Sequence, residues 1–325
     1  MYLLPVALYA GIVIILDPLK CFRSHNEYYG GSFVSPNREN VCLNLFEKVD
    51  SGSKINSFIF GNSCSHAFKI NNWISNLPNG SKGFHLDAYR ETVYGILKKL
   101  EYLEKKGNSI KNVLIIMDRS TFSKKLNSYM YVMPKKLDVK TNQFYIEHLK
   151  AMTSIKFVGA YIYYALFHEN LPFMEAYQFS LTQPRSDDNT GDLFYWQDEE
   201  IRKDSLKFFT GLSKKDWTKR INLMNLIGND SFEGLTVKNI AYLKSIENIL
   251  VKNQCNYKIV INPLFTQEKL PPAELNVLQD IYGAKNVYDF SGINDFTSRF
   301  DNYYDGLHYR PLVANNILAK IYAAN

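Results

Sequence analysis

Short apolar runs alternate with amphipathic segments along much of the chain, and this alternation constrains the fold more than any other feature. Residues 113–117 (Val-Leu-Ile-Ile-Met) are continuously apolar over the length of a strand, which is typical of strands buried on both faces in a parallel sheet. Residues 92–106 carry apolar side chains three and four positions apart, and Gly107 follows them, so they predict an amphipathic helix. Strands separated by helices form βαβ units, and we therefore predict a parallel sheet with helices on both faces.

The remaining predicted elements follow the same rhythm in two separate stretches of the chain. Strands are predicted at 55–60, 82–86, 113–117, 257–261 and 286–290, and helices are predicted from about 65 and over 92–106, 236–252, 272–282 and 311–323. These elements assign 54–124 and 233–325 to one α/β domain. The intervening residues, 125–232, lose the alternation and are rich in aromatic side chains. We predict a mostly helical insertion or cap there, which is either a substrate-binding lid or a packing appendage.

The first sixteen residues contain no charged side chain. As a helix they would reach roughly 24 Å, slightly short of the ~30 Å hydrocarbon core of a bilayer. A cleaved signal peptide would need a basic start and a small-x-small cleavage site, and residues 1–22 contain neither. A buried core strand or helix is the other alternative. We predict that 1–22 form a single-pass membrane anchor and that 23–53 form a polar connector.

Composition and spacing exclude several classes of function. The 38 Lys and Arg exceed the 32 Asp and Glu by a net charge of +6, but no dense basic run marks a nucleic-acid surface. The four cysteines lack C-x-x-C spacing, which excludes a zinc ribbon, although a single Cys21–Cys42 bridge is compatible with the sequence. The histidines lack metal-ligand spacing, and neither a P-loop nor a G-x-G-x-x-G motif is present. We therefore predict no metal and no cofactor.

A first candidate motif, Gly-Asn-Ser-Cys-Ser at 61–65, follows the predicted strand 55–60. It lies at the carboxyl edge of the sheet, where open α/β folds bind ligands. Gly61 permits a tight turn, and the backbone N–H of Ser63 would point toward an oxyanion at the start of a helix. The structural alternative is that Ser63 or Ser65 caps the helix. Cys64 is expected to be buried rather than nucleophilic.

A second candidate motif, Asp305-x-x-His308, lies just before the last predicted helix. A loop with this spacing can direct the carboxylate at one imidazole nitrogen and leave the other free to take a proton from a hydroxyl. This is the arrangement of base and orienting carboxylate that a serine nucleophile needs.

Taken together, an early G-x-S and a late D-x-x-H resemble the SGNH (GDSL-type) hydrolase superfamily over roughly 54–122 and 235–323. The resemblance implies a flavodoxin-like αβα sandwich in which Ser63 is the nucleophile, His308 the general base and Asp305 its orienter. Where the family's first block has Asp this chain has Asn62, and the third predicted strand ends in Asp118-Arg119. The candidate oxyanion or substrate-orienting residues are Asn62, Asp118, Arg90 and Arg119. Each arginine is also compatible with a purely structural charge.

The apolar N-terminus followed by Asp17-Pro18 also resembles the membrane-tethered SGNH-like proteins found beside bacterial polysaccharide and teichoic-acid acylation systems. This resemblance implies a serine acyl esterase or O-acyltransferase that acts on a cell-envelope glycan without a cofactor. It implies a bacterial inner-membrane protein with a periplasmic catalytic domain and a multi-pass membrane O-acyltransferase as partner. The alternative is a catalytically inactive SGNH-like module that binds glycan or scaffolds an envelope polysaccharide-modification complex.

Overall fold

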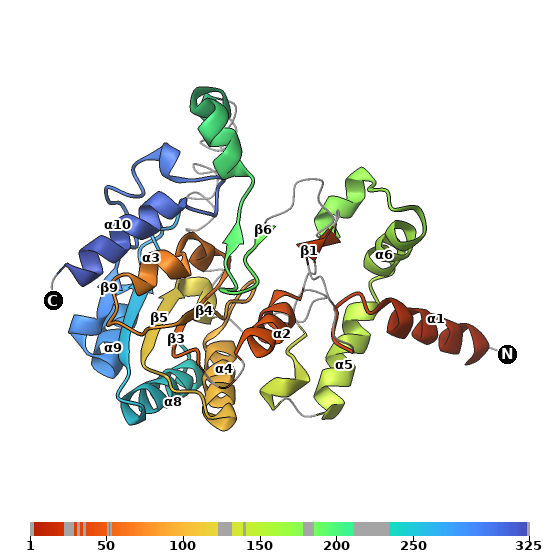
Figure 1. Cartoon of the computed structure of the whole chain (residues 1–325), viewed down its shortest axis with the longest axis horizontal. Coiled ribbons are helices and arrows are strands. Elements are labelled where there is room, and N and C mark those ends of the chain that lie inside the picture. The colour runs from red at the N-terminus through yellow and green to blue at the C-terminus, as the bar shows by residue number, and fades with distance from the viewer. Residues whose placement is uncertain are drawn as a thin grey trace.

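A five-stranded parallel sheet forms the centre of the molecule (Figure 1). The structure is a computed structural model that describes residues 3–22, 29–30, 33–34, 37–50, 52, 54–122, 132–138, 141–177, 185–210 and 234–323. The strands of the sheet are β3 (Ser57–Gly61), β4 (Gly83–His85), β5 (Asn112–Met117), β8 (Asn256–Ile261) and β9 (Val287–Asp289). Their spatial order is β4-β3-β5-β8-β9 and every neighbouring pair is parallel. Numbered along the chain this is the order 2-1-3-4-5 of flavodoxin-like sheets, which confirms the predicted α/β class.

The register aligns the carboxyl ends of the three central strands. Gly61 of β3 pairs with Ile116 of β5, and Met117 of β5 pairs with Ile261 of β8. The residues that follow these strands therefore meet at one edge of the sheet. The reversal of strand order between β3 and β5 lies at this edge, where open α/β sheets bind their ligands.

Alternate side chains of each strand enter two separate apolar cores. Phe58 and Phe60 of β3 face one core, whereas Ile59 between them faces the other. The first core is covered by α2 (Arg38–Val49), α4 (Val93–Lys106), α8 (Val237–Lys252) and α9 (Pro272–Tyr282), and the second by α3 (Ile70–Ile74) and α10 (Pro311–Tyr322). Figure 1 shows α3 and α10 on the side of the sheet opposite α4 and α8. Because both faces of the sheet are covered, the central strand β5 is apolar from Val113 to Met117, as is typical of parallel sheets.

Several short elements connect these layers. The 3₁₀ turns are η1 (Ser63–Ala67), η2 (Arg119–Phe122), η3 (Lys135–Leu137), η4 (Pro172–Tyr177), η5 (Ala284–Asn286) and η6 (Phe300–Asn302). A two-stranded ribbon, β1 (Tyr29–Gly30) and β2 (Phe33–Val34), follows the N-terminal helix. The helix predicted from about residue 65 is thus divided into η1 and α3.

The described part of the insertion is mostly helical. It contains α5 (Thr141–Met152), α6 (Ile155–Phe167) and a helix over 197–210, together with the antiparallel hairpin of β6 (Arg185–Ser186) and β7 (Leu193–Phe194). In Figure 1, α5 and α6 lie away from the sheet, whereas the hairpin lies beside β4, where the backbone N–H of His85 donates to the carbonyl oxygen of Thr190. Residues 187–192 form the turn of this hairpin.

The predicted connector contains a helix that the sequence analysis did not predict. Helix α2 places Val41, Leu45 and Phe46 in the larger core. Its first turn is polar but buried, because Arg38 pairs with Asp87. The sequence pattern did not indicate this helix, because its first turn carries the charged Arg38. The partner that allows Arg38 to be buried, Asp87, lies 49 residues further along the chain.

The predicted membrane anchor is wrong. The apolar N-terminus forms α1 (Leu3–Leu16), a helix of 14 residues, which spans only about 21 Å against the ~30 Å of a hydrocarbon core. No helix in the described part of the chain reaches the length and apolarity needed to cross a membrane. This finding contradicts the predicted single-pass anchor and the inner-membrane, periplasmic location that depended on it. Val13 instead packs in a small cluster with Phe144 of α5 and Phe157 of α6.

The compatible disulfide is also not formed. All four cysteines are free thiols. Cys42 is fully buried in α2, whereas the backbone N–H of Cys21 donates to the side chain of Asp17.

Candidate active site

Asp118 joins the carboxyl ends of three neighbouring strands. Its Oδ2 accepts a hydrogen bond of 2.7 Å from Nδ2 of Asn62 and one of 3.0 Å from Nδ2 of Asn262. Asn262 in turn accepts a 2.6 Å hydrogen bond from the hydroxyl of Tyr309. Because Tyr309 adjoins His308, this buried chain of contacts brings the C-terminal loop to the turn that follows β3.

The turn after β3 depends on a glycine and an asparagine. A Cβ at Gly61 would lie 2.8 Å from the carbonyl oxygen of Ile116, a separation that only glycine avoids. Oδ1 of Asn62 accepts the backbone N–H of Cys64 at 3.0 Å, as an N-cap does. The cap is thus Asn62 and not Ser63 or Ser65, and Ser63 stands at the first position of η1 with its side chain only partly buried.

The structure brings Ser63, His308 and Asp305 together. Nε2 of His308 lies 2.9 Å from Oγ of Ser63, across 245 residues of sequence. Nδ1 of the same ring lies 2.9 Å from Oδ2 of Asp305. Oδ1 of Asp305 also accepts the backbone N–H groups of Leu307 and His308 at 2.7 and 2.8 Å. The carboxylate is therefore oriented by its own loop before it orients the imidazole.

The charges in this loop determine the hydrogen-bond directions. Burial raises the pKa of Asp305, but the hydrogen bond and charge of His308 and the two backbone N–H groups outweigh it, so the pKa lies below its ordinary value. The ionised carboxylate accepts from Nδ1 of His308. When the ring is neutral, Nε2 then has a free lone pair that accepts the hydroxyl proton of Ser63. This arrangement can convert Ser63 into an oxygen nucleophile.

A second Ser–His–Asp arrangement lies beside the first and is completely buried. Oγ of Ser65 is 2.8 Å from Nε2 of His85, and Nδ1 of His85 is 3.2 Å from Oδ1 of Asp192. None of these three residues is more than 2% exposed, so no substrate reaches Ser65. The arrangement ties η1 to β4 and to the turn of the β6–β7 hairpin. Ser65 therefore provides an internal comparison for Ser63.

A buried polar chain extends from α2 to the ring of His308. Arg38 binds the carboxylate of Asp87 through Nε and a terminal nitrogen at 2.7–3.1 Å. Asp87 lies 2.7 Å from Nε2 of His66, and Nδ1 of His66 lies 2.7 Å from the hydroxyl of Tyr195. The ring of Tyr195 packs against His308 with centroids 5.9 Å apart. This chain places the insertion hairpin in contact with the triad.

Of the four predicted oxyanion or orienting residues, two lie next to the Ser63 turn and the two arginines do not. Asn62 and Asp118 bind each other at the base of the Ser63 turn. Arg119 faces away from them, toward Glu268 at 3.5 Å and Glu274 at 3.7 Å. Arg90 is exposed, with a φ of +54°, in the turn between β4 and α4. The N–H of Ser63 remains a candidate oxyanion donor, and a second donor stays a prediction.

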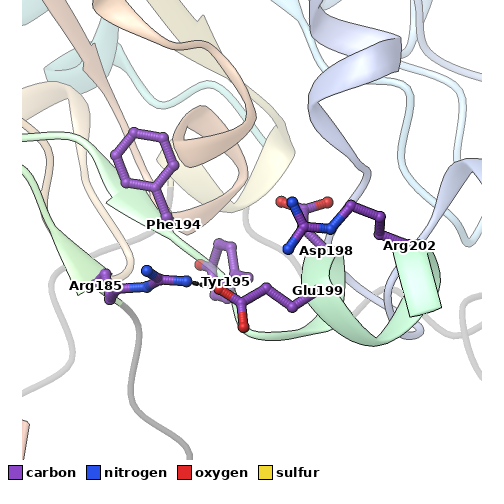
Figure 2. Close-up of a pocket in the computed structure, with 6 residues that line it drawn as sticks. All are labelled: Arg185, Phe194, Tyr195, Asp198, Glu199 and Arg202. Carbon is purple, nitrogen blue, oxygen red and sulfur yellow. Dashed lines mark ion pairs between the residues drawn. The ribbon is translucent and has the colours of Figure 1, made fainter.

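A pocket of about 410 Å³ lies between the β6–β7 hairpin and the 197–210 helix (Figure 2). Tyr195 forms part of its wall and also contacts His308. Arg185 of β6 and Glu199 of the 197–210 helix form an ion pair at its edge. The lining residues are Arg185, Phe194, Tyr195, Asp198, Glu199 and Arg202.

Sequence reasoning missed four residues of this site. Arg38 and Tyr195 stand in no recognisable motif, and their partners are distant in sequence. Asp87 carried a usable signal, because it closely follows a strand at the carboxyl edge of the sheet. His66 lies three residues after Ser63, and only the fold shows that it points away from Ser63 toward Asp87. No family model matches the chain, and no curated protein matches it.

Proposed function

We propose that this protein is an SGNH-like serine acyl esterase or O-acyltransferase. The observation that carries the proposal is the 2.9 Å contact between Oγ of Ser63 and Nε2 of His308, with Asp305 bound to the opposite nitrogen. The 2-1-3-4-5 strand order and the position of Ser63 after the first sheet strand support the resemblance to the SGNH fold. The partial exposure of Ser63 supports access by a substrate.

In the proposed reaction His308 takes the hydroxyl proton while Oγ of Ser63 forms a bond to the carbonyl carbon of an ester. The tetrahedral intermediate then expels the alcohol oxygen, which leaves with the proton from His308, and an acyl-serine remains. Water or a second alcohol gives its proton to His308 and attacks the acyl-serine, which releases acid or a new ester and restores Ser63. Asp305 stabilises the imidazolium that forms in each half. In this reaction the N–H of Ser63 is the proposed donor to the oxyanion.

A glycan is the substrate that we propose for this reaction. The pocket, whose wall residue Tyr195 contacts His308, combines the aromatic side chains of Phe194 and Tyr195 with two arginines and two carboxylates, whose formal charges cancel. A neutral molecule with many hydroxyl groups and apolar C–H faces matches that lining, because planar charged groups bind hydroxyls and aromatic rings pack on C–H surfaces. A cell-envelope glycan and a multi-pass O-acyltransferase partner, both implied by the resemblance, stay predictions.

A catalytically inactive SGNH-like module, which binds glycan or scaffolds a modification complex, is the second candidate. One observation favours it: the residues that follow the second and third sheet strands, Asp87 and Asp118, are both buried and engaged in hydrogen bonds within the protein. Carboxylates in these places offer no N–H to an oxyanion.

Labelling with a serine-directed fluorophosphonate distinguishes the two candidates. We expect the wild-type chain to form one adduct, and mass mapping of its peptides to locate that adduct on Ser63. Ser63→Ala should abolish the adduct, whereas Ser65→Ala, which changes the buried serine two residues away, should retain it. No adduct on the wild-type chain, or an adduct elsewhere than Ser63, would contradict the enzyme and favour the inactive module.

A further inference from the structure

The carboxylate that orients His308 is a weak anchor by itself. Asp305 lies only three residues upstream, in the same loop, and its side chain is 45% exposed. Where water reaches one partner of an ion pair or hydrogen bond, it competes for that partner and weakens the contact. An imidazole that must stay aligned with Ser63 therefore needs a second contact.

Tyr195 provides a contact on the face of the imidazole. The two rings are tilted by 33° with centroids 5.9 Å apart. The ring of Tyr304, which precedes Asp305, packs on Tyr195 at 5.5 Å. Aromatic rings at these separations attract one another and exclude water from the space between them. Tyr195 thus touches both ends of the segment that carries the base and its carboxylate.

The hydroxyl of Tyr195 makes a hydrogen bond to His66 whose direction can be assigned. Burial raises the pKa of Asp87, but the charge of Arg38 and the hydrogen bonds from Arg38 and His66 outweigh it and hold that pKa well below its usual range, so the carboxylate is ionised. Nε2 of His66 must therefore donate to Asp87. Burial lowers the pKa of His66 to about 4, so the ring is neutral at pH 7 and its Nδ1 accepts. The hydroxyl of Tyr195 is the donor to that nitrogen.

The far end of this chain is also anchored. Arg38, Asp87 and His66 are each at most 1% exposed, so water does not compete for their hydrogen bonds. Arg38 also donates to the carbonyl oxygen of Gly191 in the hairpin turn. Lys69 donates to the carbonyl oxygen of Leu193. The hairpin that precedes Tyr195 is therefore bound both to α2 and to Lys69, between η1 and α3.

We propose that Tyr195 is a positioning residue for His308 and that the buried chain Arg38–Asp87–His66 holds Tyr195 in place. The proposal rests on the proposed function, because His308 is the proposed base. It gives the insertion a defined role: the β6–β7 hairpin completes the alignment of the triad. The ring contacts His308, and the hydroxyl determines where the ring sits.

Two substitutions of Tyr195 separate the ring from the hydroxyl. Tyr195→Ala removes both, and we expect the rate of fluorophosphonate labelling at Ser63 to fall about 100-fold, as misalignment of catalytic groups does. Tyr195→Phe keeps the ring and should restore most of this loss, leaving a rate several-fold below wild type. Tyr282→Phe is the matched control, since it removes a buried tyrosine hydrogen bond of 3.1 Å to Leu243, remote from the site.

The control should lose stability toward urea as Tyr195→Phe does and yet label at the wild-type rate. A Tyr195→Ala protein that labels within twofold of wild type would overturn the proposal, as would an equal slowing in Tyr195→Phe and Tyr282→Phe. A long-range ¹H–¹⁵N spectrum of the histidine rings provides a readout independent of activity. We expect one Nδ1–H tautomer of His308 in the wild-type chain and a mixture in Tyr195→Ala.

An unchanged His308 signal in Tyr195→Ala would also overturn the proposal. If the wild-type chain is not labelled at all, the proposed function fails, and the spectrum still decides whether Tyr195 positions His308. The two failures are therefore distinguishable.

Discussion

The side-chain amide of Asn62 donates a 2.7 Å hydrogen bond to Asp118, and this contact ties the turn before Ser63 to the end of the neighbouring strand. Asn262 donates to the same carboxylate oxygen from the other side. One buried carboxylate thus holds the ends of β3 and β8 on either side of β5. Since Asn262 also binds Tyr309, the position of the His308 loop depends on this carboxylate.

Asp118→Asn should lower both stability and activity. The other oxygen of Asp118 accepts the N–H and hydroxyl of Ser120. In Asp118→Asn, the new NH₂ group would replace one of these two accepting oxygens and would therefore face a hydrogen-bond donor. Loss of hydrogen bonds to a buried charged group costs about 2–3 kcal/mol in the free energy of unfolding, measured by urea denaturation, and should slow the labelling of Ser63. Asp138→Asn changes an exposed ion pair with Lys105 and should leave the free energy of unfolding almost unchanged, because water screens the pair. Equal stability of the two variants would contradict this role for Asp118.

Gly61→Ala should destabilise the protein by about 1–3 kcal/mol, the usual effect of overpacking. The new methyl group would lie 2.7 Å from Cβ of Ser65 and 2.8 Å from the carbonyl oxygen of Ile116, so either the Ser63 turn or β5 must shift. Gly159→Ala is the opposite case, because Gly159 lies inside α6 with no atom within 4 Å of a new Cβ. That change should stabilise the protein by about 0.5–1 kcal/mol. Thermal or urea unfolding of the pair tests the prediction, and a Gly61→Ala protein as stable as wild type would refute it.

The lowered pKa of His66 should make the free energy of unfolding depend on pH. Burial lowers its pKa from 6.5 to about 4, so between these values the unfolded chain binds a proton that the folded chain does not. The contribution of His66 to the free energy of unfolding should therefore be complete above about pH 6.5. It should be lost as the pH decreases toward 4, which lowers the free energy of unfolding by roughly 3 kcal/mol. Urea denaturation at several pH values measures this slope.

His66→Gln should flatten the slope, although His148, whose pKa is also lowered by burial, contributes to it in both proteins. His168→Asn, at an exposed position after α6, should leave the wild-type slope unchanged. A slope in His66→Gln as steep as that of wild type would exclude His66 as its source.

The strands of the sheet and the helices beside them were predictable because the pattern of apolar residues within each segment indicates which of its side chains are buried. Every residue of β5 is buried, and an unbroken apolar run indicates that burial without knowledge of its neighbours. Helix α4 shows its buried face through the spacing of Ile96, Leu100 and Leu103. Helix α2 was not predictable in the same way, because Glu39 is buried against Lys99, a partner that only the fold supplies.

At the N-terminus, by contrast, the sequence predicted a feature, the membrane anchor, that the structure does not have. Its lack of charge indicated burial in lipid, yet its helix is 14 residues long and Val13 packs against the insertion. An apolar run reports that a segment avoids water, and its length and neighbours decide what covers it.

The amino-acid sequence by itself determined the parallel α/β sheet and identified Ser63, Asp305 and His308 as candidates, because hydrophobic periodicity and short motifs are local properties. Only the tertiary structure decided that these three meet, that Ser65 is buried in an arrangement of the same kind, and that the chain of Arg38, Asp87, His66 and Tyr195 reaches the ring of His308. The reason is physical: a buried polar side chain needs a partner wherever the folded chain provides one, and no local pattern records a partner that lies a hundred residues away.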